Sequence, residues 1–416
     1  MMALEGPYLA AVIARLPDAT FNLAAYGVAF AFAILIESPV IMLMSASTAL
    51  AEDAERLRRL RRFSWGLNAV ATLLLAIMLL PWVYGPLMEG VVGLPPEVAR
   101  LTRGALLILL PWPAAIGYRR FLHGLLIRTG RTRLVAAGTV IRLAAMGGVT
   151  ITVALLTSLP GAWAAAAGLS SGVIVEAIVA RFMVGPTLRE LRATPPEDPD
   201  DIPSYRAIAD FYLPLALTSL IGLSVQPLLT FFMGRAASPI ESLAVFPVVH
   251  ALSFVFRSFG LAFQEAVIAL IGRHNEHFEP VARFALGLGL ATAGALALVT
   301  FTPLSHIWFQ KVSGLTPELE AFALGPARLL VPLPAMSVLL SLQRAVLVQG
   351  RRTGPITRAS ALEVMGIATV FPTLAWGFDM VGVTAAFSAF VVGRMLGNLF
   401  LWRQMRHTLQ KRSLGT

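Results

Sequence analysis

The sequence of 416 residues lacks cysteine altogether and has few charged residues. Without cysteine, disulfide bonds and thiolate metal sites are excluded. Charged residues make up 13% of the chain and hydrophobic residues 57%, which is too apolar a balance for a soluble domain of this length. No glycine-rich loop followed by lysine occurs, so we expect neither ATP hydrolysis nor a cofactor, and no metal site is predicted. The composition therefore argues against a soluble enzyme.

Long apolar runs are present instead, along the whole chain. A helix needs ~20 residues to cross a hydrocarbon core of ~30 Å, and several of these runs are longer. The alternating segments of a membrane β-barrel do not occur, so we predict an all-α integral membrane protein. The predicted full spans are 22–50, 64–86, 98–127, 134–157, 161–188, 206–234, 239–271, 281–308, 318–348, 355–378 and 381–404.

The chain repeats itself with a step of about 220 residues. Gly93–Glu97 corresponds to Gly314–Glu318 at a step of 221, and Pro111-Trp112-Pro113 corresponds to Pro332-Leu333-Pro334. Such a duplicated bundle of apolar segments is typical of secondary transporters. The repeated Pro-x-Pro predicts a kink in each half, either a moving hinge or a static bend. Further pairs at this step are Arg131 with Arg352, Gly161 with Gly382, and Gly172 with Gly393.

An acidic, proline-rich stretch at Thr194–Pro203 separates the two halves. Proline opposes helix and the carboxylates favour water, so this stretch is expected to be exposed. Six spans per half is an even number, so both halves should enter the membrane from one side, related by an axis along its normal. We predict an N-terminal lobe at 1–188, a cytoplasmic linker at 189–205 and a C-terminal lobe at 206–416.

The first helix is predicted to be only partly present in this sequence. Residues 3–16 align with 223–236, which form the second part of the span that begins near Arg206. The counterpart of Arg206–Gly222 would precede Met1. A short re-entrant opening is the alternative, although a half-helix would leave backbone groups unsatisfied in lipid.

Basic residues gather in alternate loops and explain the net charge of +10 without a nucleic-acid partner. The loops 51–63, 128–133, 189–206, 272–283 and 351–358 and the tail after 402 carry most of them. The positive-inside rule places this set in the cytoplasm. We therefore expect a multi-pass protein of a bacterial cytoplasmic (inner) membrane with its C-terminus in the cytoplasm.

Charged residues within the spans are the first candidates for function, because each costs ~2.5–3.5 kcal/mol on insertion scales unless it is paired or hydrated. Glu37 corresponds to Arg257 at a step of 220, and Arg142 corresponds to Glu363 at a step of 221. Such inverted charges can face each other across a central cavity as a gate. Alternatively, each pairs within its own half, for example Glu37 with Arg142, and braces the bundle.

Other polar residues are weaker candidates. Arg119, Arg120, His123 and Arg344 are expected at the cytoplasmic ends of matching spans. A basic cluster at a cavity mouth suits phosphate or carboxylate groups, but arginines can also reach for lipid headgroups, and His123 alone favours a packing role. Further polar positions within the spans are Glu5, Glu176, Gln226, His250, Gln264, Glu265 and Arg394.

The segment Phe211–Leu220 resembles the multidrug/oligosaccharidyl-lipid/polysaccharide (MOP) flippase superfamily. Within this MATE-like group the chain is most similar to the progressive ankylosis (ANKH-like) branch, a likeness supported by Ala25-Tyr26-Gly27 and Pro326–Pro334. The resemblance implies twelve helices in two pseudo-symmetric six-helix lobes around a central cavity lined by helices 1, 2, 7 and 8. By that implication, the cavity candidates are Glu5, Glu37, Gln226, Arg257, Gln264 and Glu265.

The sequence therefore predicts a secondary transporter that works by alternating access between two lobes. The arginines and the ANKH-like likeness favour a small organic or phosphorylated anion as substrate, with H⁺ or Na⁺ as a possible coupling ion. The alternatives are a flippase for a lipid-linked oligosaccharide and a cation-coupled multidrug exporter of the same superfamily. We expect a monomer surrounded by membrane lipid. A membrane enzyme is not expected, because no clustered acid and base residues indicate catalysis. A scaffold is not expected either, because a scaffold gives no reason to keep so many charges within the spans.

Overall fold

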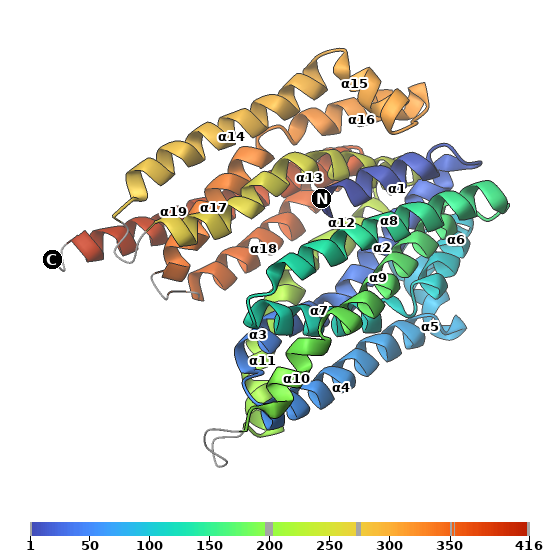
Figure 1. Ribbon diagram of the computed structural model, residues 1–416. Helices are drawn as coiled ribbons and strands as arrows, with labels where there is room; N and C mark the ends of the chain where they lie inside the picture. The colour runs from blue at the N-terminus through green and yellow to red at the C-terminus, as the bar shows by residue number, and fades with distance from the viewer. Residues whose placement is uncertain (1, 196–202, 272–275, 350–351, 353, 414–416) are drawn as a thin grey trace. The chain divides into compact units, whose positions relative to one another are not determined.

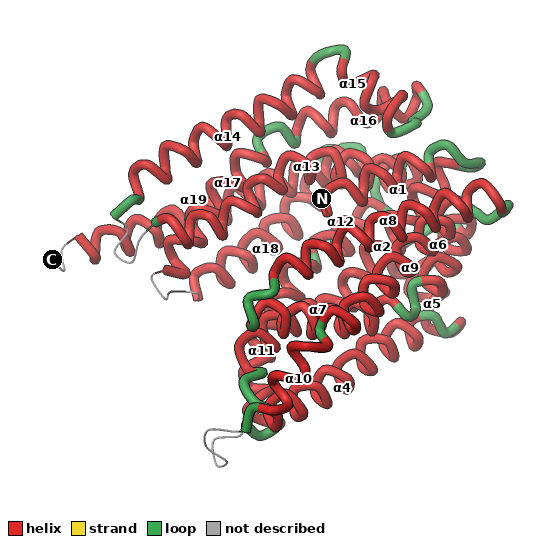
Figure 2. Tube along the Cα trace, in the orientation of Figure 1, coloured by secondary structure: helices red, strands yellow, loops and turns green. Residues whose placement is uncertain are grey.

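The computed structural model describes residues 2–195, 203–271, 276–349, 352 and 354–413, so the middle of the predicted linker lies outside the described residues. Within these ranges the chain is built of helices and short connections, and no strand is present (Figure 2). The predicted all-α class is confirmed.

The first half of the chain contains twelve helical segments (Figure 1). They are η1 (Met2–Leu4), α1 (Glu5–Ile13), α2 (Ala19–Ile41), α3 (Leu43–Leu50), α4 (Ala54–Met78), α5 (Pro81–Gly85), the π-helical η2 (Pro86–Val92), α6 (Pro96–Ile108), α7 (Trp112–Arg128), α8 (Thr132–Leu156), α9 (Gly161–Met183) and α10 (Gly185–Ala193).

The second half follows the same plan. Its segments are α11 (Tyr205–Leu223), α12 (Val225–Met233), α13 (Pro239–Leu270), α14 (Phe278–Phe301), α15 (Leu304–His306), the π-helical η4 (Ile307–Val312), α16 (Pro317–Leu329), α17 (Leu333–Gln349), α18 (Gly354–Gly377) and α19 (Gly382–Ser413).

Many of these helices are long and apolar enough to cross a bilayer. The described residues contain nine such spans, or up to eleven if each of two bent helix pairs counts as one. The bent pairs are α4 with Pro81–Val92, at 75°, and α6 with α7, at 41°. The chain is therefore a multi-pass membrane protein.

The arginine-rich segment 51–63, expected to be a loop, is mostly helical. Asp53 caps α4 through its Oδ1, which accepts hydrogen bonds from the backbone N–H groups of Glu55 and Arg56, both at 2.9 Å. Glu55 also forms ion pairs with Arg58 at 2.5 Å and with Arg59 at 3.2 Å. A cap and charge pairs three or four residues apart both stabilise a helix start, so α4 begins ten residues before its apolar part at 64.

The duplication is visible in the local backbone of both halves. Asp18 and Ser238, at a step of 220, precede α2 and α13 with φ of 54° and 51°. Gly93 and Gly314, at a step of 221, follow η2 and η4 with φ of 82° and 75°, a left-handed conformation that glycine adopts without strain. Because both halves retain the same unusual conformations, the sequence repeat is also a structural repeat.

Equivalent buried hydrogen bonds tie the helices of each half together. The Oδ1 of Asn22 on α2 accepts a bond of 3.0 Å from the N–H of Ala162 at the start of α9. At the corresponding place the hydroxyl of Ser242 on α13 accepts a bond of 3.1 Å from the N–H of Val383 on α19. Each bond satisfies an N–H group that the first turn of a helix leaves free.

The chain forms two compact units, and two of their three boundaries lie inside helices, in α1 and in α12. Unit 1 comprises Met1–Glu5 and Leu16–Pro227, and unit 2 comprises Gly6–Arg15 and Leu228–Thr416. Relative to a division near residue 195, α11 therefore belongs to unit 1, and most of α1 belongs to unit 2. Both internal boundaries lie close to the equivalent prolines Pro7 and Pro227.

Specific contacts hold these two segments in their units. On α11, the Tyr212 hydroxyl donates a hydrogen bond to the carbonyl of Pro39, and its ring packs edge-on against Phe63 at 5.3 Å. On the segment after α1, Arg15 donates hydrogen bonds to the carbonyls of Lys311 and Val312, at 2.6 and 3.0 Å. Both segments are therefore integral parts of their units.

Candidate functional site

The centre of the charged site in unit 1 is Glu176 on α9, whose side chain is 0% exposed. Arg119 on α7 donates a hydrogen bond to its Oε2, and the Nε of Arg142 on α8 lies 3.2 Å from the same oxygen. The Nε2 of His123 lies 3.7 Å from the other oxygen. Three helices thus converge on one buried carboxylate.

A second carboxylate joins this cluster through Arg142, which also donates a hydrogen bond to Glu5 at the start of α1. Glu37 is buried near the end of α2, within electrostatic reach of Arg120, Arg119 and Arg142. Its Oε2 has no hydrogen-bond partner among the described residues. The neighbouring arginines donate hydrogen bonds to other groups, so the Oε2 of Glu37 remains a buried acceptor without a donor among the described residues.

The alternative pairing of Glu37 with Arg142 is wrong, because Arg142 is occupied by Glu5 and Glu176. Arg119 does not reach for lipid headgroups, because its side chain is 2% exposed and forms an ion pair with Glu176. His123 is also buried. Arg119 and His123 are therefore part of a buried network around Glu176, whereas Arg120 and Arg344 are half-buried. The alternative in which Glu37 faces Arg257 stays a prediction.

Unit 2 holds a different set of charges. The Nη2 of Arg394 on α19 lies 2.8 Å from the Oε1 of Glu363 on α18. Arg257 on α13 is 8% exposed and has a single weak hydrogen bond, from Nε to the Ser337 hydroxyl at 3.4 Å. Arg344 on α17 bonds the hydroxyl of Ser360, also at 3.4 Å. Arg257 and Arg344 each lie within electrostatic reach of Arg394 and Glu363.

An aromatic ring supports two of these arginines. The guanidinium carbons of Arg257 and Arg394 lie 5.0 and 5.6 Å from the centre of the Phe390 ring. The face of an aromatic ring attracts cations, so Phe390 partly compensates the missing carboxylates without neutralising charge. His250 stacks with Phe390 at 6.4 Å and with Phe254 at 6.3 Å, and so belongs to the aromatic surroundings of the arginines.

The two units carry the same helix-bridging ion pair with the signs reversed. In unit 1 the arginine is on the fifth span and the carboxylate on the sixth, as Arg142 and Glu176. In unit 2 the carboxylate is on the fifth span and the arginine on the sixth, as Glu363 and Arg394. Arg142 and Glu363 are equivalent in the repeat, whereas their partners lie one helical turn apart. The ion pairs therefore brace equivalent helices.

The balance of charge differs between the units. The site in unit 1 brings three arginines, Arg119, Arg120 and Arg142, together with three glutamates, Glu5, Glu37 and Glu176. In the described part of unit 2, the three arginines at positions 257, 344 and 394 meet a single carboxylate, that of Glu363. Buried charge without a partner is costly, so the excess of cations in unit 2 favours the arrival of an anion.

The remaining predicted residues contribute less. Gln226 on α12 and Gln264 on α13 are half-buried and outside the two charge networks, and the side chain of Glu265 lies outside the described residues. Glu176 and Phe390 emerged as central only in the structure. A fixed register aligns Glu176 with Gly397, so the repeat gave no signal for the pair. No group of three possible metal ligands occurs among the described side chains.

Comparison with known proteins found no matching family model and no matching curated protein. Among solved structures, the chain is similar to a multidrug resistance MATE family transporter of the MOP superfamily in its inward-facing conformation, with a TM-score of 0.75 and 15% identity over 98% of this chain and 96% of that chain. It is also similar to the lipid II flippase MurJ in an inward closed conformation, with a TM-score of 0.74 and 13% identity over 99% and 88%.

A third similar structure is the MATE multidrug transporter DinF-BH in complex with R6G, with a TM-score of 0.70 and 13% identity over 97% of this chain and 92% of that chain. At such identities the likeness establishes the fold, which is that of MATE transporters over nearly the whole chain. The ANKH-like branch stays a prediction.

Proposed function

We propose that this protein is a secondary membrane transporter that moves a small organic or phosphorylated anion by alternating access between two lobes. A fold shared with MATE transporters and MurJ supports transport or flipping across a membrane. A chain without the nucleotide-binding loop of an ATPase is driven by an ion or substrate gradient. Enzymatic activity has no support in the clustered residues, which pair as charges and form no nucleophile and base.

The observation that supports an anionic substrate is the excess of arginines over carboxylates in the described part of unit 2. Donors without a partner include the Nη1 of Arg257, the Nε of Arg344 and the Nε of Arg394. Guanidinium groups bind carboxylate and phosphate through paired, charge-assisted hydrogen bonds. An anion held by two of these arginines would satisfy the free donors and offset the excess of charge.

Flux measurements with purified protein in vesicles test this proposal. We expect uptake of radiolabelled citrate or pyrophosphate above the level of empty vesicles, with saturation at increasing concentration. Arg257→Gln should abolish this flux, because it removes a buried arginine that has no carboxylate partner and only a weak hydrogen bond to Ser337 among the described residues. No flux of any small carboxylate or phosphate above empty vesicles would reject the proposal.

A matched control separates the site from general loss of charge. Arg283→Gln removes an arginine that is 77% exposed and paired with Glu279 on the same helix turn. Surface pairs of this kind contribute little, so flux should be unchanged. If both arginine variants reduce flux equally while they insert normally, the role given to Arg257 is wrong.

Unit 1 favours the second candidate, a cation-coupled multidrug exporter. Glu37 is buried and keeps an oxygen without a hydrogen-bond partner, as a site for H⁺ or Na⁺ would. Glu37→Gln should then remove coupled transport and leave insertion intact. Efflux of a cationic dye, measured beside anion flux in the same vesicles, decides between the two substrates. A lipid-linked substrate would instead show as headgroup translocation in an accessibility assay.

A further inference from the structure

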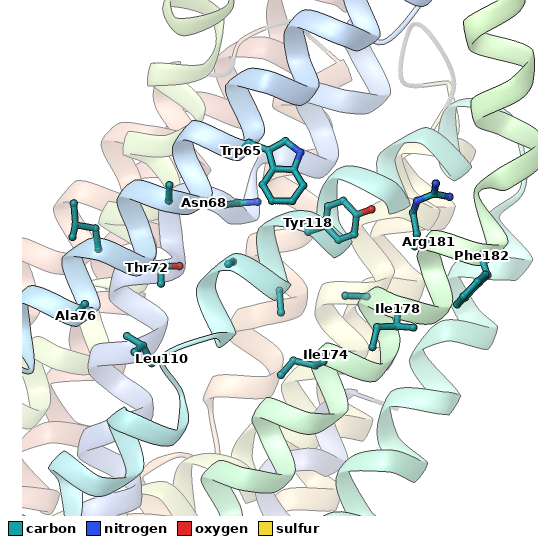
Figure 3. Close-up of a pocket in the computed structure, with 15 residues that line it drawn as sticks. Trp65, Asn68, Thr72, Ala76, Leu110, Tyr118, Ile174, Ile178, Arg181 and Phe182 are labelled. Atoms are coloured by element: carbon teal, nitrogen blue, oxygen red, sulfur yellow. The ribbon is translucent and has the colours of Figure 1, made fainter.

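An apolar groove of about 820 Å³ opens on unit 1 between α4, α7 and α9. Figure 3 shows Trp65 of α4 and Tyr118 of α7 at one end and Ile174 and Ile178 of α9 along its wall. The rings of Trp65 and Tyr118 lie 5.8 Å apart. The volume of the groove falls within the ~300–1,000 Å³ typical of sites for small molecules. The groove is therefore large enough to hold a ligand.

The groove belongs to the repeated module. A smaller groove of about 360 Å³ lies on unit 2, between α17 and α19. Every residue that lines it corresponds, at a step of 221, to a residue that lines the groove of unit 1. The pairs are Ala115 with Met336, Tyr118 with Leu339, Ile174 with Met395, Ala177 with Asn398, Ile178 with Leu399, and Arg181 with Trp402. The hollow is therefore a property of the helix packing that both halves retain.

The groove of unit 2 includes Asn398, whose Oδ1 has no hydrogen-bond partner among the described residues, and the groove of unit 1 has polar atoms of the same kind. Asn68 on α4 is 4% exposed, and its Oδ1 has no hydrogen-bond partner, nor does the Oγ1 of Thr72 one turn later. Figure 3 shows both side chains on the groove side of α4. Buried polar atoms without a protein partner indicate a polar ligand atom or water beside them.

Positive charge gathers at one end of this groove. Arg181 lines it near the end of α9, and Arg61 and Arg62 lie one turn before Trp65 on the same face of α4. All three side chains are exposed, and no ion pair or hydrogen bond engages them among the described residues. The positive-inside rule predicts this end on the cytoplasmic side, where Trp and Tyr rings favour the level of the lipid headgroups.

We propose that this groove binds a phospholipid with an anionic headgroup. An acyl chain lies between α4, α7 and α9, and the headgroup reaches Arg61, Arg62 and Arg181. The carbonyl region of the lipid lies beside Trp65 and Tyr118. Arginines at a membrane surface attract anionic lipid, so three of them near one groove favour an anionic over a zwitterionic headgroup.

Quenching of tryptophan fluorescence by brominated lipids tests this site. The contribution of Trp65, which is 61% exposed, is the difference between the unaltered protein and Trp65→Phe. In phosphatidylcholine vesicles, brominated phosphatidylglycerol should quench Trp65 at a several-fold lower mole fraction than brominated phosphatidylcholine. Trp82 on α5, which is 72% exposed and outside the groove, serves as the reference and should be quenched equally by both lipids.

Charge removal shows whether the arginines cause the preference. In the triple variant Arg61→Gln, Arg62→Gln, Arg181→Gln the two brominated lipids should quench Trp65 equally, and Arg181→Gln alone should weaken the preference. The single variant keeps the test valid if the triple variant fails to fold. Equal quenching of Trp65 by both lipids in the unaltered protein would overturn the proposal, as would a full preference in the triple variant. Either outcome leaves the anion transport proposal untouched, because that depends on unit 2.

Discussion

Three glutamates within the predicted spans have different surroundings, which predict different roles. Glu176 is held by Arg119 and Arg142, and Glu363 is held by Arg394. Glu37 has arginines nearby but an Oε2 without a hydrogen bond. A carboxylate that is already paired braces the bundle, whereas an unpaired one in the same environment is free to take a proton or a cation.

At this scale Glu176→Gln should destabilise the protein strongly. The glutamine removes the negative charge and leaves Arg119 as a buried cation without the carboxylate that it contacts directly. Breaking one side of a buried pair costs about 3–5 kcal/mol. Thermal unfolding in detergent, followed by size-exclusion chromatography, should show a melting temperature lowered by many degrees.

Glu97→Gln is the matched control, because Glu97 pairs with Arg100 at 2.5 Å on an exposed helix turn. Its loss should leave the melting temperature unchanged, since exposed pairs contribute little. A Glu176→Gln variant as stable as the Glu97→Gln variant would contradict the stabilising role given to Glu176.

At the scale of helices, the last two spans of each half approach closely at an equivalent glycine. A Cβ atom at Gly172 on α9 would lie 3.0 Å from the carbonyl oxygen of Arg142. At Gly393 on α19 it would lie 2.8 Å from the carbonyl oxygen of Glu363. Small residues of this kind let helices in membranes pack backbone to backbone. In each half, the close approach of the two helices also brings the arginine and the glutamate of the ion pair within contact distance of each other.

Gly393→Ala should therefore push α18 and α19 apart. Overpacking of a close contact costs about 1–3 kcal/mol, and the Glu363–Arg394 pair should lengthen with it. We expect a lower melting temperature and reduced flux, measured on the same preparation in detergent and in vesicles.

Gly148→Ala on α8 is the control for this substitution, because a Cβ there would meet nothing within 4 Å. Alanine favours helix over glycine, so this variant should be as stable as the unaltered protein or slightly more so. If both alanine variants behave alike, the close approach at Gly393 does not limit packing.

At the scale of the whole molecule, the two units differ in buried charge, and each contains a segment from the other half of the chain. Unit 1 balances its buried arginines with glutamates, whereas the described part of unit 2 does not. Unit 1 includes α11 from the second half of the chain, and unit 2 includes Gly6–Arg15 from the first. Neither unit is therefore encoded by one continuous half of the sequence.

This exchange predicts how fragments behave. A fragment of residues 1–195 lacks α11, whose Tyr212 contacts Pro39 and Phe63. A fragment of residues 203–416 lacks Arg15, which bonds Lys311 and Val312. We expect each fragment to aggregate when expressed alone, and the two to co-purify as a monodisperse species when expressed together. Two separately stable, monodisperse halves would contradict the shared segments.

Much of the fold was accessible from the sequence. Long apolar runs predict spans because a helix in lipid must satisfy its backbone internally. The repeat step paired Gly93 with Gly314, and the structure shows both glycines in the same left-handed conformation. Element ends were less predictable. Asp53 and the ion pairs of Glu55 extend α4 into a segment expected to be a loop, because capping and charge pairing outweigh low hydrophobicity there.

The candidate site was predictable only in part. Charged residues within spans are rare, so Arg142, Arg257 and Glu363 were identifiable as candidates. The residues that pair with them were not identifiable. A side chain one helical turn away can reach the same neighbour, so the two partners, Glu176 and Arg394, do not align at the repeat step of 221. For this reason the sequence suggested Glu37 for Arg142, while packing of α8 against α9 selects Glu176.

The sequence alone determined the helical membrane class and the duplication, since both follow from hydrophobic length and from repeated residues. Only the tertiary structure decided which charges neutralise one another and which remain unpaired. The reason is physical: the energy of a buried charge depends on partners within a few ångströms, and these distances arise from how helices from distant parts of the chain pack.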